Sequence, residues 1–587
     1  MQPTVFVTKE DKGFLESLEE RIKGSESDTR VILDYPIVYI HYWNETVEKQ
    51  YDVYVGESSD IIERTKEHYK DGQFENKWQY SLVHAKSTPE MIVVGHNHFN
   101  KSLTMDIENR LIQYVLALPT VNKVHNSKGN PQRAYYPVSE FNDLFSKIWR
   151  KLRKHNKNLF LSEAEIKDSA IFKASPFHKL TDQQLLIQNE IIEKVDAAIA
   201  TGETGQLVFV EGEAGTGKTV LTNSTFYKLL NSEKSNGEKK YDCRLLVNHE
   251  EQKSVYQQIA KKLQVDDYEK IVSRPTSFIN HHPVDAPIDV AFVDEAHLLW
   301  TQGKQSYQGK NQLDDIMKRA RVTVIMFDEN QILTTEEYWE PDQIDELRQL
   351  SISQGNYMTL TNQLRMNAGP DVIEWIDNIT KDFVIKPIGS DTKNYDVQVL
   401  DSPFLLYETI KKKAKDERSK LSRIVASYDW EYVDKTSPKD GSKYWGVRIT
   451  DPKTGKEFYK PWNRQLFSTL DKKQRRERNE LAWAEQPQTI DEIGSTFTIQ
   501  GFDLVYSGVI IGPSVQYRNG CIEFHPEESH SKKAIQNRTL SDGKKQRFAE
   551  YLLSHELRVL LTRGVKGMYI YACDEALRKA LKESLDR

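Results

Sequence analysis

Residues 207–219 read LVFVEGEAGTGKT. Four apolar residues, Leu207 to Val210, form a short buried-strand pattern, and the spacing Gly212-x4-Gly217-Lys218-Thr219 follows at once. Residues 220–230 continue with a helical pattern of apolar side chains. A strand, a glycine-rich loop and a helix in this order are the context of the phosphate-binding loop known as Walker A. The alternative is an ordinary glycine-rich turn, but every position of the pattern and its context is matched.

The chemistry of this loop predicts ATP and Mg²⁺ as cofactors. Three glycines, Gly212, Gly215 and Gly217, let backbone N–H groups surround the β-phosphate, and the start of the following helix adds positive potential. We expect Lys218 to bridge the β- and γ-phosphates and the Thr219 hydroxyl to ligate Mg²⁺.

An acidic pair follows a second apolar strand. The strand pattern at residues 289–293 is followed directly by Asp294-Glu295, some 75 residues after the loop. This is the Walker B arrangement. We expect Asp294 to hold Mg²⁺ through water and Glu295 to orient and polarise the attacking water. An apolar run that ends in Asp-Glu is commonplace alone, but behind a phosphate-binding loop it indicates an ATPase.

Strands and helices alternate from Leu180 onward. The strands are continuously apolar, in the runs LVFVEG, RLLVNH, DVAFVDEA and RVTVIMFDEN. Buried parallel strands have this composition, so we expect a parallel sheet covered on both faces. A second α/β block covers about 355–587, and a polar insertion with tryptophans interrupts it at about 429–484.

Composition sets broad limits. The 587 residues exceed the size of a single core, so we expect three or four domains. We find no signal-peptide pattern and no apolar run long enough for a bilayer, and therefore expect no membrane partner. Three cysteines without metal-like spacing fit a reduced cytoplasm. The net charge of −6 requires any nucleic-acid surface to be a local basic groove.

Further short motifs occur in a fixed order around the loop. They are LTDQQ at 180–184, FDENQ at 327–331, LTNQLR at 360–365, TFTIQGFD at 496–503 and VLLTRG at 559–564. In this order the chain resembles superfamily 1 helicases, with Phe327 in place of a usual glycine. The resemblance implies that Gln183 or Gln184 reads adenine and that Arg563 is an arginine finger. It also implies nucleotide contacts from the remaining motif residues Gln331, Arg365 and Gln500.

The resemblance narrows in the second block. SRIVASYDW at 422–430, KPWN at 460–463 and QGFD followed by VYSGVIIGP resemble a bacterial Schlafen-like family (Schlafen group 3-like DNA/RNA helicase) over about 175–587. This resemblance implies a nucleic-acid path near 248–252, Gln331 and 496–500. Four tryptophans of the insertion are candidates for stacking on bases, although packing inside a small subdomain is the favoured alternative for most of them: Trp430, Trp445, Trp462 and Trp483.

The N-terminal 150 residues carry a second set of chemical groups. Residues 37–56 read IVYIHYWNETVEKQYDVYVG, with Tyr39 and Tyr54 on two predicted strands, Val31 to Tyr42 and Val53 to Gly56. Arg64 and His68 share one helix face, Glu108 lies in the helical stretch LTMDIENRLIQYV, and Asn126 follows. In this order the residues resemble the GIY-YIG nuclease family. Ile37 replaces its first glycine, and fourteen residues separate the tyrosines, more than is usual in the family.

The GIY-YIG resemblance implies a single Mg²⁺ or Mn²⁺ bound by Glu108, because cutting a phosphodiester needs an activated water, a Lewis acid and a charge clamp. Tyr39 would help to deprotonate the water, and Arg64 would clamp the phosphate. Tyr54 and His68 would complete the pocket, with Asn126 as an anchor. Alternatively, Tyr39 and Tyr54 are strand aromatics, and Arg64 and Glu108 are solvated helix residues.

The expected fold class is therefore α/β, a small GIY-YIG-type domain followed by two RecA-like parallel-sheet lobes. We expect the nuclease domain at 1–150, a linker at 151–178, lobe 1 at 179–352 and lobe 2 at 353–587 with the insertion. The expected function is an ATP-dependent helicase or translocase coupled to a DNA endonuclease, in bacterial anti-phage defence or genome maintenance. An ATP-gated nucleic-acid sensor with a non-cleaving N-terminal module is the alternative. RNA as substrate, an oligomer and a defence-system partner protein stay open.

Overall fold

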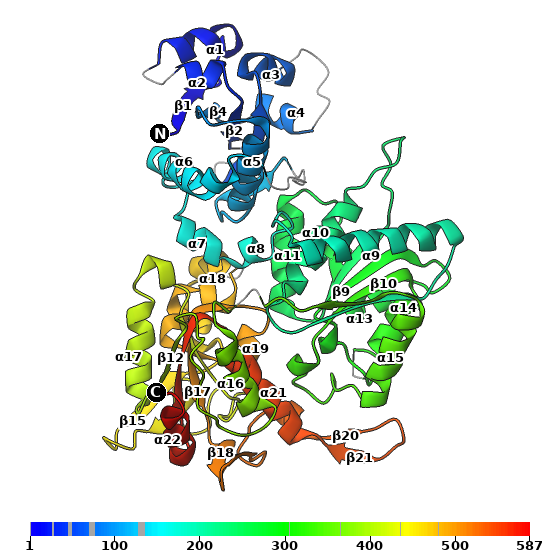
Figure 1. Ribbon diagram of the computed structural model, residues 1–587, viewed down its shortest axis with the longest axis vertical. Helices are drawn as coiled ribbons and strands as arrows, with labels where there is room; N and C mark the ends of the chain where they lie inside the picture. Colours follow the sequence, from blue (N-terminus) through cyan, green and yellow to red (C-terminus); the bar gives the residue numbers. More distant parts are fainter. Residues whose placement is uncertain are drawn as a thin grey trace. The chain divides into compact units, whose positions relative to one another are not determined.

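The computed structural model describes residues 2–25, 29–44, 50–69, 77–126, 135–303, 306–363, 366–434, 436–478 and 481–586. The chain forms two compact units (Figure 1). Unit 1 is Met1–Leu180 with Val255–Glu269, and unit 2 is Thr181–Ser254 with Lys270–Arg587. None of the helices in these described ranges is both long and apolar enough to cross a bilayer.

Unit 1 is built on a five-stranded mixed sheet in the order β1-β4-β2-β3-β5. The first three pairings are antiparallel, and β3 pairs with β5 in parallel. Side chains alternate between the two faces along each strand, so residues 37, 39, 41 and 43 of β2 share one face and residues 38, 40 and 42 share the other. The strands are β1 (Thr4–Lys9), β2 (Ile37–Trp43), β3 (Tyr51–Ser58), β4 (Glu90–Gly95) and β5 (Val121–Val124).

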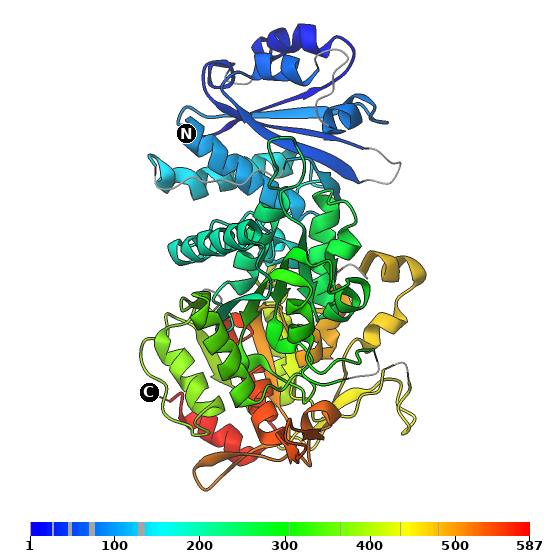
Figure 2. The same cartoon turned by 90° about the vertical axis from the view of Figure 1, so that its right-hand side faces the viewer.

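Helices cover both faces of this sheet (Figure 2). Apolar side chains of α1, α2, α3 and α4 join the odd-numbered face of β2 in one buried core. On the other face α5 contacts β2 and β3, and α6 packs against α5. The helices are α1 (Phe14–Lys23), α2 (Thr29–Leu33), α3 (Ile61–His68), α4 (Lys77–Val83), α5 (Lys101–Leu116) and α6 (Phe141–His155).

Three features of unit 1 differ from the sequence-based expectation. The strand expected to begin at Val31 begins at Ile37, because residues 31–33 belong to α2 and bury Val31 and Ile32 in the core. The edge strand β1 was not expected. Residues 151–178, expected as a linker, contain the end of α6, α7 (Glu163–Asp168) and α8 (Ala170–Lys173), all within unit 1.

Aromatic packing explains why the expected linker is folded. The Trp149 side chain is 1% exposed, its Nε1–H donates to the Leu161 carbonyl at 2.9 Å, and its ring lies edge-on to Tyr114 at 4.8 Å. Phe160 and Phe172 are also buried, against Trp149 and Tyr114 respectively. This cluster ties the segment after α6 to the core of unit 1.

Unit 2 contains a six-stranded sheet in the order β11-β6-β10-β9-β7-β8, with every pairing parallel. The expected covered parallel sheet is confirmed: α13, α14 and α15 share a core on one face, and α9 and α10 pack together on the other (Figure 1). The strands are β6 (Gln206–Gly212), β7 (Cys243–Val247), β8 (Val272–Ser273), β9 (Ile288–Asp294), β10 (Ala320–Phe327) and β11 (Tyr357–Leu360). The helices are α9 (Asp182–Thr201), α10 (Lys218–Leu230), α13 (Pro275–His281), α14 (Gln312–Met317) and α15 (Pro341–Ser353). Two further helices, α11 (Glu250–Lys262) and α12 (Tyr268–Ile271), each extend across an end of the segment 255–269 that belongs to unit 1.

A second parallel sheet of unit 2 has the order β12-β22-β17-β13-β16. Its strands are β12 (Asp396–Val399), β13 (Arg423–Ala426), β16 (Ile493–Gly494), β17 (Leu504–Ile511) and β22 (Gly564–Ala572). Around it lie α16 (Pro370–Thr380), α17 (Pro403–Lys413), α19 (Thr496–Ile499), α21 (Ala549–Leu561) and α22 (Glu575–Glu583). We call the two sheets with their helices lobe 1 and lobe 2.

The insertion in lobe 2 contains the hairpin of β14 (Gly446–Thr450) and β15 (Glu457–Pro461), followed by α18 (Lys472–Arg478). Trp445, Trp462 and Trp483 are buried, and only Trp430 of the four candidate stacking residues is partly exposed. Packing is therefore the role that the structure gives to these three. Two further hairpins pair β18 (Val515–Arg518) with β19 (Cys521–Phe524) and, after α20 (Lys532–Ile535), β20 (Asn537–Thr539) with β21 (Lys545–Arg547).

The buried Trp149 gives a test of the folded segment after α6. Trp149→Ala removes a large core side chain, which costs about 3–5 kcal/mol. Amide protection over residues 141–173, measured by hydrogen exchange, should fall by a factor of about 10²–10⁴, while residues 206–230 of unit 2 keep theirs. Unchanged protection over 141–173 would contradict the packing described above, and the exposed Tyr136, substituted by alanine, is the control.

Candidate functional site

The predicted phosphate-binding loop lies between β6 and α10, at the carboxyl end of a central parallel strand. Gly215 and Gly217 have φ values of 90° and 82°, a region that only glycine adopts without strain. Gly217 is the residue before the first turn of α10, so the N–H groups of that turn face the loop. The glycines therefore shape the loop as the sequence pattern predicts.

Lys218 is 5% exposed, and its ammonium is held by groups of its own lobe. The Nζ atom donates to the Gly212 carbonyl at 2.6 Å and the Glu213 carbonyl at 2.9 Å, and lies 3.5 Å from Asp328 Oδ2. Burial raises the pKa of Asp328, but the positive charge of Lys218, the hydrogen bond from Gln331 and the nearby Arg558 and His297 together outweigh burial and hold this pKa below its usual range. A buried cation is thus paired in advance with an anion.

The Walker B residues lie beside the loop. Thr219 Oγ1 donates to Asp294 Oδ2 at 3.3 Å, so the two predicted Mg²⁺ ligands are neighbours. The Gln252 amide, expected near the nucleic-acid path, donates to the same carboxylate oxygen at 3.0 Å. Oxygen donors from a hydroxyl and a carboxylate suit Mg²⁺, so this pair fits the ion that the loop implies.

Glu295 follows in a left-handed backbone conformation with φ of 51°, which is strained for a residue other than glycine. Its side chain is buried, and among the described residues Oε2 has no hydrogen-bond partner; the atom lies 3.4 Å from His297 Nε2. Burial lowers the pKa of His297, which keeps this imidazole neutral. The carboxylate oxygen is therefore ready to accept a hydrogen bond from a water molecule.

Residues of lobe 2 reach the same site. Arg563 is fully buried and its Nη2 donates to Gln331 Oε1 at 2.9 Å, while the Gln331 amide donates to Asp328 Oδ2 at 2.7 Å. Gln500 donates to the Gln331 carbonyl at 3.4 Å. A chain of polar contacts thus joins Lys218 of lobe 1 to Arg563 of lobe 2 within unit 2.

A second contact between the lobes was not anticipated from the sequence. Arg558 of α21 bonds to Asp377 of α16, and its Nη2 donates to Glu213 Oε2 of the phosphate-binding loop at 3.2 Å. The Lys381 ammonium donates to Glu213 Oε1 at 3.1 Å. Two cations of lobe 2 therefore face the loop. The sequence around Arg558 gave no signal of this contact.

The remaining predicted nucleotide contacts lie at the edge of the site. Gln184 caps α9 and its amide donates to the Gly217 carbonyl at 3.3 Å. Gln183 is half-buried and donates to the Thr359 carbonyl at 3.0 Å. Both candidates for the adenine reader are thus bonded to backbone carbonyls, Gln184 at the loop and Gln183 at β11. Arg365 lies outside the described residues.

In unit 1 the predicted nuclease residues converge on the Tyr39 hydroxyl. The hydroxyl lies 2.8 Å from His68 Nε2, and Arg64 Nε donates to it at 3.3 Å. Tyr39 is fully buried, and burial raises its pKa well above the usual range. Gly56 faces Tyr39 across the β2–β3 pair, where a Cβ atom would lie 2.5 Å from the phenol oxygen. Only glycine leaves room for the phenol there.

Tyr54, Glu108 and Asn126 complete this group. The Tyr54 ring stacks on Trp78 at 4.0 Å, and burial raises its pKa. The Asn126 amide donates to the Val55 carbonyl of β3 at 2.8 Å and to Glu108 Oε1 at 2.9 Å. Asn126 therefore fixes the Glu108 carboxylate beside the strand that carries Tyr54.

His41 and Glu10 extend the cluster beyond the predicted residues. His41 Nδ1 lies 2.8 Å from Glu10 Oε1, and Tyr69 donates to the other oxygen of Glu10. His41 Nε2 is buried without a hydrogen-bond partner among the described residues. The ring centroids of His41 and His68 are 5.8 Å apart. The signal was present in the sequence, because His41 is two residues after Tyr39 in the same strand and so shares its face.

No group of three or more His, Cys, Asp and Glu side chains in the described part of the chain could hold a metal ion. A nuclease ion would therefore have Glu108 as its single protein carboxylate and keep most of its waters, which is usual for Mg²⁺ at a phosphodiester. The half-buried Glu108, oriented by Asn126, fits that role.

Residues 205–574 match the family described as Schlafen group 3, DNA/RNA helicase domain. An uncharacterized protein of Saccharomyces cerevisiae is 33% identical over 411 residues, which cover 63% of this chain and 83% of the yeast protein. A chain from a structure of two coordinating Pif1 helicases that unwind forked double-stranded DNA is 11% identical, with a TM-score of 0.27, over 70% of this chain and 95% of that chain. A PRRSV helicase is 11% identical, with a TM-score of 0.24, over 65% of this chain and 56% of that chain.

The histidine beside Tyr39 has a measurable signature. Burial, followed by the nearby His41 and Arg64, lowers the pKa of His68 from 6.5 to about 3. The folded state therefore holds fewer protons than the unfolded state, so stability from this group is complete above about pH 6.5 and is lost as the pH falls toward 3. The ring resonance of His68, assigned by its absence in His68→Gln, should stay in its neutral position at pH 5. A resonance that titrates near pH 6.5 would contradict the buried geometry.

Proposed function

Because the chain belongs to the Schlafen group 3 DNA/RNA helicase-domain family, we propose that unit 2 is an ATP-driven helicase or translocase. The observation that carries this proposal is the chain of contacts from Lys218 through Asp328 and Gln331 to Arg563, which spans both lobes. A motor needs such a connection, because ATP turnover must change the fit between its lobes.

ATP would interrupt this chain at Lys218. The phosphates offer the ammonium a stronger anionic partner than the loop carbonyls, and Arg563 would turn from Gln331 to the γ-phosphate. Thr219 and Asp294 would hold Mg²⁺, which would neutralise charge on the phosphates. The Glu295 oxygen would accept a hydrogen bond from the attacking water and so orient it. Arg558 and Lys381 would hold the loop to lobe 2 through Glu213.

Removing the loop ammonium should stop the motor. We expect Lys218→Ala to lower ATP hydrolysis at least about a hundredfold, because positioned charges act strongly on the transition state. Lys234→Ala, at an exposed lysine of the same lobe paired with Glu238, is the matched control. ATPase and strand displacement on a forked duplex are measured together. If Lys218→Ala hydrolyses ATP within a fewfold of the unsubstituted rate, the phosphate-binding assignment is wrong. If the unsubstituted protein hydrolyses ATP but does not displace a strand, the sensor alternative is favoured.

For unit 1 we infer a metal-dependent endonuclease of the GIY-YIG type that acts on DNA. The convergence of Arg64 and His68 on the Tyr39 hydroxyl supports it. Neutral His68 can accept a hydrogen bond from the phenol at Nε2 and so orient it, and Arg64 would stabilise negative charge on the phenol oxygen. Glu108 would hold the metal ion that polarises the water, and the Tyr39 oxygen would help to draw the proton of this water away toward solvent.

A motor joined to a nuclease fits a role in defence against foreign DNA or in genome maintenance, since ATP-driven movement would deliver a strand to the cutting site. Restriction of phage growth by the intact protein, compared with Glu108→Gln, tests the defence role.

The two activities should separate by substitution. Glu108→Gln should abolish Mg²⁺- or Mn²⁺-dependent cleavage of labelled DNA while ATP hydrolysis stays within twofold, because unit 2 binds its own ion through Thr219 and Asp294. Asp106→Asn is the matched control. Asp106 lies on the same helix but accepts a hydrogen bond from Tyr135 at 2.6 Å, so its loss leaves the Glu108 contact intact. Cleavage that persists in purified Glu108→Gln protein would falsify the nuclease assignment.

A further inference from the structure

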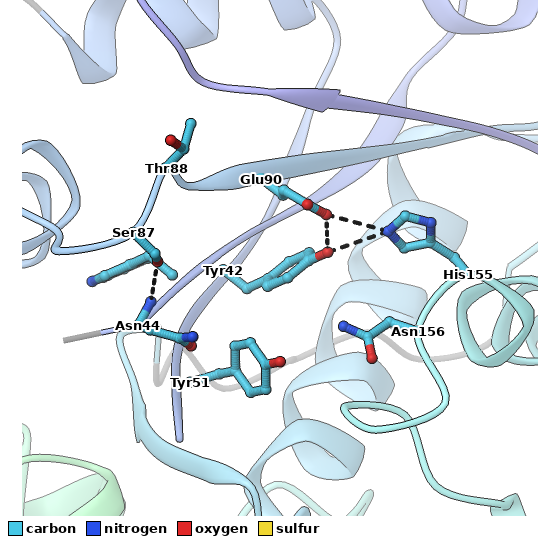
Figure 3. Close-up of a pocket in the computed structure, with 9 residues that line it drawn as sticks. Tyr42, Asn44, Tyr51, Ser87, Thr88, Glu90, His155 and Asn156 are labelled. Atoms are coloured by element: carbon cyan, nitrogen blue, oxygen red, sulfur yellow. Dashed lines mark hydrogen bonds and ion pairs between the residues drawn. The ribbon is translucent and has the colours of Figure 1, made fainter. Parts of the chain in front are cut away.

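A cavity of about 320 Å³ opens on the face of the unit 1 sheet opposite to Tyr39 (Figure 3). Three neighbouring strands each contribute one side chain to it. Tyr42 of β2 pairs in register with Glu90 of β4, and Tyr51 of β3 is two residues before Val53, the other partner of Tyr42. Residues on one face recur every second position, so these three side chains share a face.

The wall of the cavity is formed where α6 ends, at His155 and Asn156. A polar cluster joins this wall to the strands (Figure 3). The Tyr42 hydroxyl donates to Glu90 Oε2, and His155 Nε2 lies 3.2 Å from the Tyr42 oxygen and 3.3 Å from the same carboxylate oxygen. The cluster fixes a carboxylate and an imidazole at the edge of an aromatic floor.

One polar atom of the cavity lacks a partner. Asn44 lines the cavity and donates its backbone N–H to Ser87, but its side-chain Oδ1 is buried without a hydrogen-bond partner among the described residues. An unsatisfied buried acceptor costs about 1–3 kcal/mol. A ligand with N–H groups would satisfy it. The acceptors Asn44 and Glu90 thus both call for a donor-bearing ligand.

The aromatic side chains add a shape requirement. Tyr42 and Tyr51 lie edge-to-face, with centroids 5.8 Å apart and an angle of 72° between the rings. Such a pair offers a flat face to a planar ring, and stacking on an aromatic side chain is worth about 1–3 kcal/mol per base. A planar ring with N–H donors on its edge is the description of a nucleobase.

Charge decides where a phosphate would lie. Glu90 inside the cavity repels anions, whereas Lys154 and Lys157, next to the wall residues in sequence, are exposed. A nucleotide would therefore insert its base and leave its phosphate at the lysines, as proteins that bind single strands combine stacking with a basic surface.

We propose that this cavity binds one unpaired base of a nucleic-acid strand, stacked on Tyr51 and bonded by its N–H edge to Glu90 and Asn44. The proposal rests on the proposed function in one respect, that unit 1 handles nucleic acid. The residues that line the cavity do not include Glu108 or its partner Asn126, so the cavity would hold the strand without cutting it. A free nucleotide has the same recognition chemistry as a base in a strand.

Photocrosslinking tests the cavity directly. The full chain carrying Glu108→Ala, which keeps the strand intact, is irradiated with a short single-stranded oligonucleotide that contains 5-iodocytosine, whose amino group carries two N–H donors. We expect a crosslink in the peptides that carry Tyr42 or Tyr51, with a half-saturating oligonucleotide concentration at least about tenfold higher after Glu90→Ala, since hydrogen bonds to a charged group are strong. Tyr136→Ala, at an exposed tyrosine outside the cavity, should leave the concentration unchanged.

Surface substitutions guard against a folding artefact. Lys154→Ala with Lys157→Ala changes two exposed side chains, and it should reduce the slope of log affinity against log salt for this crosslink by about 1.4. Crosslinks found only in residues 181–587, or an unchanged half-saturation in both Glu90→Ala and the double lysine variant, overturn the proposal.

Competition by unlabelled nucleoside monophosphate distinguishes the two sources of the base. Full competition at concentrations near those of the oligonucleotide assigns the cavity to free nucleotides, and weak competition assigns it to a strand. Both results support base recognition. The cleavage assay with Glu108→Gln is independent of the crosslink. A crosslink without cleavage by the unsubstituted protein contradicts the nuclease proposal and supports base binding in the cavity. Cleavage without the crosslink supports the nuclease proposal and contradicts base binding.

Discussion

The buried ammonium of Lys218 is the constraint around which unit 2 is organised. A charge with 5% exposure is tolerated only when it is paired, and here it is paired with loop carbonyls and the Asp328 carboxylate. Asp328 in turn orients Gln331, which receives Arg563 from the other lobe. Each partner in this chain is fixed by the one before it. An anion that replaces Asp328 as the partner of Lys218 therefore also changes the hydrogen bond between Gln331 and Arg563 of lobe 2.

Unit 1 has a comparable constraint in the buried phenol of Tyr39. Burial disfavours the charged form of a phenol, so the Tyr39 oxygen needs a hydrogen-bond partner and a positive charge beside it. His68 and Arg64 supply them at 2.8 and 3.3 Å. The absence of a side chain at Gly56 creates the space for this arrangement, because a Cβ atom would overlap the phenol. The glycine of the Tyr54-Val55-Gly56 sequence thus acts through Tyr39.

Sequence reasoning succeeded where the determinant is local. The loop at Gly212 to Thr219, its strand and its helix follow from a dozen consecutive residues, and the apolar strands of lobe 1 follow from their composition. It failed where long-range packing decides the structure. The segment after α6 is folded because Trp149 and Phe172 pack against Tyr114. Val31 belongs to a helix because its side chain packs in the core that α1 and α2 share. The bond between Arg558 and Glu213 joins residues 345 positions apart and leaves no local trace.

The period of two along a strand makes one short sequence serve both faces of the unit 1 sheet. In the stretch Tyr39 to Tyr42, the odd positions Tyr39 and His41 enter the cluster with His68, and Tyr42 enters the cavity with Glu90. A shift of one residue in the β2–β4 pairing would exchange the two faces and destroy both clusters. The register is held by the apolar residues Ile37, Val38 and Ile40, which are fully buried between the helical layers. A register shift would move these aliphatic side chains out of their packed positions, and the free energy this costs fixes the position of the polar groups on β2.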